Sequence, residues 1–115
     1  WWWLRAIRAR RVQRLAEARL FGDLVPEGRP AIVAFSLPNC GDCRARQAPA
    51  LNRLRAQLGD KVAVVTLMVS DHPELAERLG LMTVPATAVL DERGVLRHLN
   101  QGFVDEGRLA GQLQG

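Results

Sequence analysis

Two patterns of apolar residues alternate along the first half of the chain. Residues 31–35 and 62–69 are almost continuously apolar and rich in Val, Ile and Phe, which is typical of strands buried on both faces of a parallel sheet. Between these runs, apolar residues recur at three- and four-residue spacing: Ala48, Leu51, Leu54 and Leu58. That spacing predicts a long helix over about residues 41–58 that ends near Gly59. A strand-helix-strand unit of this length implies a right-handed parallel crossover.

A shorter helix is expected after the second strand. Asp71 is placed as its N-cap, Pro73 falls in its first turn, and Glu74 stands three positions after the cap. These are start signals of a helix. The helix is expected to end at Gly80.

The last third of the chain predicts a hairpin and a closing helix. Residues 86–90 and 95–99 flank the turn segment 91–94, which predicts a β-hairpin with Gly94 at a positive φ. A helix is expected from Asp105 onward. The order is helix, strand, helix, strand, helix, strand, strand, helix. It predicts an α/β domain with a mixed four-stranded sheet and helices on both faces.

The positive charge of the chain is concentrated at its N-terminus. A length of 115 residues suits one domain, and the net charge is +4. Residues 1–20 contain six Arg and one Glu, a balance of +5, so the remaining ten basic and eleven acidic residues give −1 for residues 21–115. We therefore divide the chain into a basic N-terminal helix, residues 1–20, and a nearly neutral domain, residues 21–115.

The first residues have the composition of a membrane boundary. Trp1, Trp2 and Trp3 precede the Arg-rich stretch, and Trp lies at headgroup level while Arg marks the cytoplasmic side. No apolar run approaches the roughly 20 residues of a span. We expect a membrane tether upstream of Trp1, with the domain on the cytoplasmic side. An ordinary first helix explains the same residues, and no further basic patch supports nucleic-acid binding.

The only two cysteines of the chain, Cys40 and Cys43, follow the first predicted strand and open the long helix. Unpaired amides at a helix N-terminus favour a thiolate, so a redox-active pair is the preferred interpretation. A structural disulfide and a metal site are the alternatives. Zinc generally needs four ligands, and His72 and His98 stand far from the cysteines in sequence. We expect no metal and no other cofactor.

With these residues in place, the chain resembles the thioredoxin-like family of thiol-disulfide oxidoreductases over about residues 29–114. The resemblance depends on the strand before Cys40-Gly41-Asp42-Cys43, on Pro49 in the next helix, on Thr83-Val84-Pro85 before the third strand, and on Gly94 and Gly102. It implies the thioredoxin fold with an extra basic N-terminal helix. It also implies a cis Val84–Pro85 bond that faces the cysteines, with Thr83, Val84 and Pro85 as substrate-binding residues. Thr83 could equally be a strand-entry residue.

The resemblance also implies a mechanism. Cys40, as a thiolate, attacks a substrate disulfide, and Cys43 then resolves the mixed disulfide. The implied partners are disulfide-containing or dithiol proteins and an electron-donating reductase or thiol. We expect reduction rather than oxidation, and a monomer. The rival interpretation is a thioredoxin-like binding or scaffold module with little redox turnover.

Several residues depart from the family pattern. Asn39 replaces the usual Trp, and Asp42 stands where reducing thioredoxins have Pro. The charge of Asp42 suits a helix N-terminus but disfavours a nearby thiolate, so Asp42 is either a tuner of the thiol or an exposed polar residue. Ala34 and Thr66 align with a buried Asp and its Lys partner in many relatives. An acid/base role would then pass to water or to another group.

Pro49 also departs from the family spacing. It follows Cys43 by six residues rather than the more common five. An interior proline is expected to kink the helix, and the extra residue predicts a bulge or a longer first turn.

Overall fold

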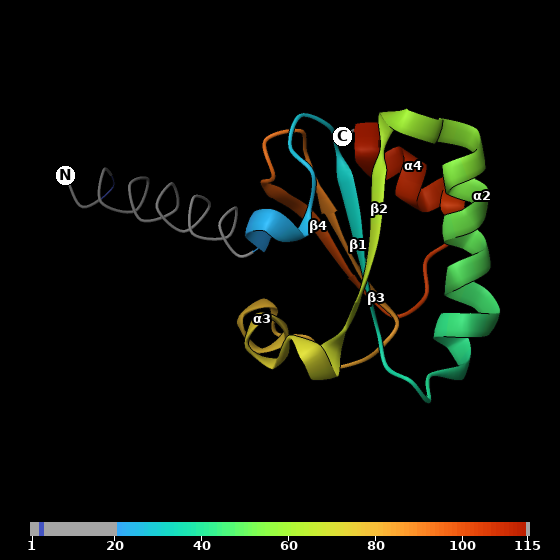
Figure 1. Cartoon of the computed structure of the whole chain (residues 1–115), viewed down its shortest axis with the longest axis vertical. Coiled ribbons are helices and arrows are strands. Elements are labelled where there is room, and N and C mark those ends of the chain that lie inside the picture. Colours follow the sequence, from blue (N-terminus) through green and yellow to red (C-terminus); the bar gives the residue numbers. More distant parts are fainter. Residues whose placement is uncertain (1–2, 4–20, 115) are drawn as a thin grey trace.

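Four strands form one mixed sheet in the computed structural model, which describes Trp3 and residues 21–114 (Figure 1). They are β1 (Ala31–Ser36), β2 (Ala63–Met68), β3 (Ala86–Leu90) and β4 (Leu96–Gln101). The spatial order is β2-β1-β3-β4. β1 runs parallel to β2 and antiparallel to β3, and β3 pairs with β4 as an antiparallel hairpin. The predicted sheet is therefore confirmed.

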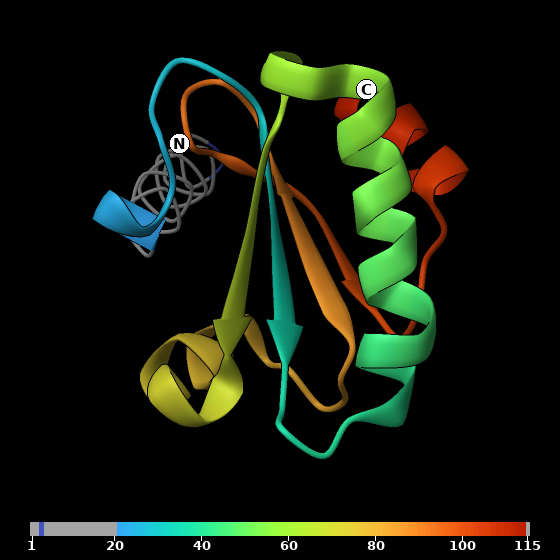
Figure 2. The ribbon, with the colours of Figure 1, turned by 45° about the vertical axis from the view of Figure 1, so that its right-hand side comes forward.

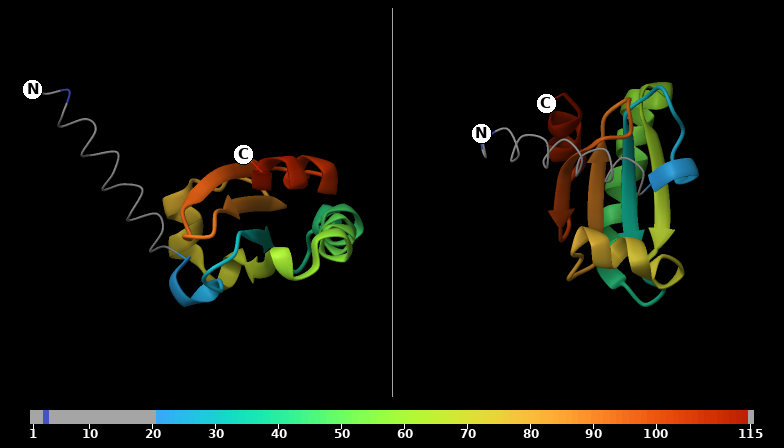
Figure 3. Two further views of the ribbon diagram at one scale, coloured as in Figure 1. Left: turned by 90° about the horizontal axis from the view of Figure 1, so that it is seen from above. Right: turned by 90° about the vertical axis from the view of Figure 1, so that its left-hand side faces the viewer.

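Helices cover both faces of this sheet. The π-helical turn η2 (Cys43–Gln47) leads into α2 (Ala48–Leu58), which packs on one face together with α4 (Glu106–Gln114). The opposite face carries α3 (Pro73–Leu79) and the 3-10 turn η1 (Gly22–Leu24), as Figures 2 and 3 show. Two further 3-10 turns are η3 (Gly59–Lys61) and η4 (Val69–Asp71).

The burial of β1 on both faces explains its continuous apolar sequence. Successive side chains of a strand point to opposite faces, so Ala31, Val33 and Phe35 pack toward α3. Ile32 and Ala34 pack toward α2 and α4. Each face is thus a separate apolar core, and β1 contributes to both.

The start of α3 differs from the prediction. Asp71 ends the 3-10 turn η4, and the N-cap of α3 is His72, without a side-chain cap hydrogen bond. The reason is Pro73, because the residue before a proline is disfavoured in the α conformation. The end was predicted correctly, since Gly80 is left-handed with φ +68°.

The β3–β4 hairpin confirms the predicted turn. Gly94 has φ +80°, and its amide donates to the Asp91 carbonyl at 3.0 Å. The Asp91 carboxylate accepts from the amides of Arg93 and Val95 at 2.9 and 3.0 Å. β4 begins one residue later than predicted and extends two residues further, to Gln101. That extension places Gln101 at the end of β4, paired with Ala86 at the start of β3.

The predicted basic helix of residues 1–20, and with it the proposed domain division, lies outside the described residues apart from Trp3, which is exposed. Among the residues that the structure describes, no helix has both the length and the apolar character needed to cross a membrane.

Candidate active site

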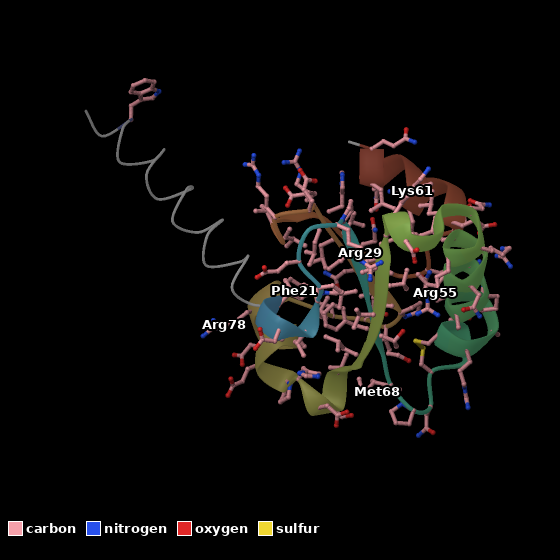
Figure 4. All side chains as sticks on the ribbon, turned by 45° about the horizontal axis from the view of Figure 1, so that its top comes forward. Phe21, Arg29, Arg55, Lys61, Met68 and Arg78 are labelled. Carbon is pink, nitrogen blue, oxygen red and sulfur yellow. A yellow bond between two sulfur atoms is a disulfide. The ribbon has the colours of Figure 1, made fainter. Side chains whose placement is uncertain are left out.

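Three loops from distant parts of the sequence lie together at one end of the sheet. Phe35 on β1 pairs with Ala86 on β3, and Ala86 pairs with Gln101 on β4. The segment after β1 carries the cysteines, the segment before β3 ends in Pro85, and the segment after β4 begins with Gly102. These three segments therefore leave the sheet side by side. Figure 4 shows the sulfur atoms of the cysteine pair beside the start of the α2 helix.

The two cysteines form a disulfide and differ in exposure. Their Cα atoms are 5.3 Å apart, Cys40 is half-buried, and Cys43 is only 6% exposed. The Cys40 amide donates to the Leu37 carbonyl at 3.1 Å, which closes the turn after β1. The Cys43 amide donates to Cys40 Sγ at 3.1 Å. A helix N-terminal amide in this position stabilises negative charge on the Cys40 sulfur once the pair is reduced.

The turn residues Asn39, Gly41 and Asp42 are all exposed. Asp42 precedes η2 in helical conformation, with φ −66° and ψ −32°, and its carboxylate makes no capping hydrogen bond. The carboxylate is therefore free in water, two residues from Cys40.

The π-helical turn accounts for the unusual position of Pro49. The Ala48 amide donates to the Cys43 carbonyl, five residues back. A π turn takes up one residue more than an α turn, so it absorbs the extra residue between Cys43 and Pro49. Pro49 then lies in the first turn of α2, where a missing N–H is tolerated. The predicted bulge is confirmed, and the irregularity lies before Pro49 rather than at it.

Two side chains of the π turn contact the segment after β4. Gln47 is 2% exposed, its Nε2 donates to the Val104 carbonyl at 2.9 Å, and its Oε1 accepts from the Val104 amide at 3.2 Å. The guanidinium of Arg46 lies 4.3 Å from the centre of the Phe103 ring. Sequence reasoning missed both contacts. A signal for Gln47 was present, because it lies four residues before Leu51, on the apolar stripe of the helix.

The loop before β3 contains the cis peptide bond Val84–Pro85, in agreement with the resemblance. Pro85 is buried, Val84 is half-buried and Thr83 is exposed. The Pro85 carbonyl accepts from the Gly102 amide at 2.8 Å. This bond joins the loop to the segment after β4.

Gln101 also holds this loop, which was not predicted. Its Oε1 accepts from the Met82 amide at 2.7 Å, and its Nε2 donates to the Gly80 carbonyl at 3.2 Å. Neither contact leaves a local sequence signal, because the partners are 19 and 21 residues away. Gln101 therefore fixes the start of the loop while Gly102 fixes its end.

The centre of the sheet has no acidic side chain at position 34, where the family resemblance implies a buried Asp. Ala34 is 4% exposed and lies between Thr66 on β2 and Thr87 on β3. Thr87 accepts a hydrogen bond from Asn100 at 3.1 Å. Within the described part of the chain, the buried polar residues are Gln47, Thr87 and Asn100, all neutral. The interior that the structure describes thus offers no ionisable oxygen or nitrogen for proton transfer.

Metal ligands do not gather near the cysteines. Across Trp3 and residues 21–114, no group of three or more His, Cys, Asp and Glu side chains is placed to hold a metal ion.

A cysteine pair at a helix start, beside a cis-proline loop on a mixed sheet, defines a thiol-disulfide oxidoreductase of thioredoxin fold. The family model "Thioredoxin" matches residues 12–114, and the chain belongs to the thioredoxin family. It is 33% identical over 95 residues to a thioredoxin of Alicyclobacillus acidocaldarius, covering 81% of this chain and 87% of that protein. A thioredoxin of Rhodospirillum rubrum is 28% identical over 81 residues, covering 70% and 77%.

Solved structures agree on the fold. The malaria-parasite thioredoxin-2 superposes with a TM-score of 0.69 at 14% identity, over 78% of this chain and 85% of that one. StoA from Bacillus subtilis superposes with a TM-score of 0.61 at 17% identity, over 77% and 85%. Membership of the thioredoxin family makes the protein an oxidoreductase and implies two classes of partner, disulfide-containing proteins and a reductase. This assignment favours an enzyme over the scaffold interpretation.

Proposed function

We propose that the protein reduces disulfides in other proteins, with Cys40 as the attacking and Cys43 as the resolving cysteine. The asymmetry of the pair carries this proposal. Cys40 is accessible and accepts a hydrogen bond at its sulfur from the Cys43 amide, whereas Cys43 is buried. A substrate can reach only the first sulfur directly.

The reaction proceeds by two exchanges. The Cys40 thiolate attacks one sulfur of the substrate disulfide, so that a Cys40–substrate bond forms and the other substrate sulfur leaves as a thiolate and takes a proton. Cys43 then loses its proton and attacks Cys40 Sγ, which forms the Cys40–Cys43 disulfide and releases the second substrate thiolate. Two electrons pass from the cysteine pair to the substrate. A reductase or donor thiol returns them.

The substrate docks as an extended peptide along the loop Thr83–Pro85, whose backbone lies at the same edge as the cysteines. Hydrogen bonds between the main chains of this loop and of the substrate give affinity without requiring one particular substrate sequence. Three exposed apolar side chains frame the area: Leu37, Met68 and Met82. Met68 lies at the same end of the sheet as the disulfide in Figure 4. Asn39, Gly41 and Asp42 are exposed on the cysteine turn and border the same area.

Reduction is favoured over oxidation by the relatives. The curated proteins named above are thioredoxins. A further relative from Mycobacterium leprae, 28% identical over 80 residues, is named as a bifunctional thioredoxin reductase/thioredoxin. We therefore take a thioredoxin reductase as the electron donor.

Reduction of insulin in the presence of a thioredoxin reductase and NADPH tests this function. The wild-type protein should turn over insulin, Cys40→Ser should abolish turnover, and Cys43→Ser should accumulate a mixed disulfide with insulin. Turnover of the wild type no faster than that of Cys40→Ser would show a binding module instead.

We also propose that the protein is a monomer held at the cytoplasmic face of a membrane by sequence upstream of Trp1. The support is the succession of three Trp and six Arg in residues 1–20. Fractionation of cells that express the full natural gene should place the protein with membranes, and an impermeant thiol reagent should leave Cys40 unlabelled until the cells are opened. Recovery in the soluble fraction, or labelling in intact cells, would contradict this placement. Light scattering of the detergent-extracted protein measures its molecular mass and should give the mass of one chain; a multiple of that mass would contradict a monomer.

A further inference from the structure

Arg46 and Phe103 form a pair at the border of the active site. Arg46 follows Cys43 by three residues on the π turn, and Phe103 follows Gly102, whose amide is bonded to the Pro85 carbonyl at 2.8 Å. The guanidinium carbon lies 4.3 Å from the ring centre. The pair therefore joins the cysteine segment to the segment that borders the cis-proline loop.

The surrounding hydrogen bonds hold this pair in place. Gln47, the next residue after Arg46, is bonded at 2.9 and 3.2 Å to both backbone groups of Val104, the next residue after Phe103. The two main chains are thus fixed to each other beside the stacked side chains. Arg46 itself remains exposed while Phe103 is half-buried. A guanidinium whose carbon lies over an aromatic ring leaves N–H groups available at its edge for a carboxylate.

The positive charge of Arg46 has no acidic partner among the residues that the structure describes. Within the described residues, no carboxylate lies within ion-pair distance of it. The acids that follow Val104 are already engaged. Glu106 accepts two hydrogen bonds from Arg53 at 2.8 and 3.2 Å, and this contact lowers the pKa of Glu106. Asp105 accepts from the Arg108 amide at 2.9 Å.

From this geometry we propose that Arg46, stacked on Phe103, binds an Asp or Glu side chain of the protein substrate close to the disulfide. This inference rests on the proposed reduction of protein disulfides. The planar fork of Arg46 accepts a carboxylate by two parallel hydrogen bonds. The protein then discriminates among disulfides by the charge of the residues around them. An ion pair of this exposure corresponds to about a 3- to 5-fold preference.

A purely structural role for Arg46 makes a different prediction. If the guanidinium only covers the Phe103 ring, its removal affects all substrates alike. Arg46→Met separates the two roles, because Met retains an apolar cover over the ring and lacks the charge. Arg44→Met is the matched control, since Arg44 is exposed on the same turn and has no aromatic partner among the described residues.

The test measures kcat/KM of the full chain on disulfide peptides that differ only in having Glu, Gln or Lys two residues before or after one cysteine. The wild type should prefer Glu over Gln by about 3- to 5-fold at one of these positions and should disfavour Lys. Raising the ionic strength from about 50 to about 300 mM should reduce the preference. Arg46→Met should remove it while leaving the Gln peptide unchanged, and Arg44→Met should retain it.

Three results would overturn the inference: equal kcat/KM for the Glu and Gln peptides, an equal loss on every peptide in Arg46→Met, or an equal loss of preference in Arg44→Met. Phe103→Leu provides a second variant that keeps the charge and removes the stack, and its Glu preference should fall toward unity. Failure of the proposed function is distinguishable, because the Gln peptide would then not be reduced at all.

Discussion

The side chain of Gln47 forms hydrogen bonds with both backbone groups of Val104. Gln47 Nε2 donates to the Val104 carbonyl at 2.9 Å, and the Val104 amide donates to Gln47 Oε1 at 3.2 Å. The two residues are 57 positions apart. This contact attaches the helical turn that follows the cysteines to the segment after β4. It satisfies two backbone groups in a buried place where water does not replace a lost partner.

Gln47→Leu should therefore lower the free energy of unfolding by about 2 to 4 kcal/mol, since a buried amide and a buried carbonyl lose their partners. Urea denaturation followed by circular dichroism measures the change. Gln57→Leu is the matched control, because Gln57 is exposed on the same helix, and it should change stability by less than about 0.5 kcal/mol. Equal stability of the two variants would mean that the Val104 groups find other partners.

Gln101 should act on substrate binding rather than on the sulfur chemistry. Gln101→Val removes the bonds to the Met82 amide and the Gly80 carbonyl, so the loop before β3 loses its fixed start. We expect KM for insulin to rise about 2- to 5-fold, with little change in the rate on a small aromatic disulfide that does not need the loop.

Steady-state kinetics on the two substrates tests this role of Gln101. Gln114→Val, an exposed change at the end of α4, is the control and should affect neither substrate. A parallel loss on insulin and on the small disulfide would argue against a positioning role.

The sequence was sufficient where one local pattern determines one local structure. The run 31–35 could be recognised as a strand because it is buried on both faces and therefore lacks polar alternation. The extra residue between Cys43 and Pro49 predicted a bulge because a helix can take up one residue only by widening a turn. Asp71 failed as an N-cap because the chain leaves β2 through a 3-10 turn and Pro73 then makes His72 the cap.

The sequence predicted the cysteine pair and the cis-proline loop of the site. Two cysteines three apart leave a signal in the sequence, and so does a proline in a family motif. The contacts of Gln101 and Arg46 do not, because each depends on a partner from a distant segment. Gln47 could be predicted in part. A polar residue on the apolar stripe of a helix indicates a buried hydrogen bond, but the sequence does not identify the partner.

Ala34→Asp would place a carboxyl where many relatives have one. Ala34 is 4% exposed and packs among apolar residues, so burial should raise the pKa of the introduced carboxyl above its unfolded value of about 3.9. Below about pH 4 the introduced carboxyl is protonated, so the mutant should lose no more stability than Ala34→Asn. It should lose stability as the pH rises, reaching a deficit of about 3 to 4 kcal/mol at pH 8 for a shift of two to three units.

Urea denaturation of this variant at several pH values measures the deficit. Ala34→Asn is the matched control, because it adds similar volume without a titratable group, and its deficit should not vary with pH. A pH-independent deficit for Ala34→Asp as well would show that the carboxyl is solvated, and hence that this part of the core is not closed to water.

Asp42 should oppose the formation of the Cys40 thiolate. Its carboxylate is exposed and makes no capping bond to the helix, and its negative charge lies two residues from the attacking sulfur. The Cys43 amide acts in the opposite sense through its bond to Cys40 Sγ. Removing the charge with Asp42→Asn should lower the pKa of Cys40 by up to about one unit, which is the scale of an exposed charge pair.

The rate of alkylation of reduced Cys40 as a function of pH reports this pKa, with Cys43 replaced by Ser in every variant so that one thiol reacts. Asp42→Pro should shift the profile in the same direction, whereas Asp60→Asn, an equal change of charge at the far end of α2, should leave it in place. A Cys40 pKa that is unchanged in Asp42→Asn would mean that solvent screens the carboxylate completely, and a raised pKa would mean that the carboxylate stabilises the thiolate.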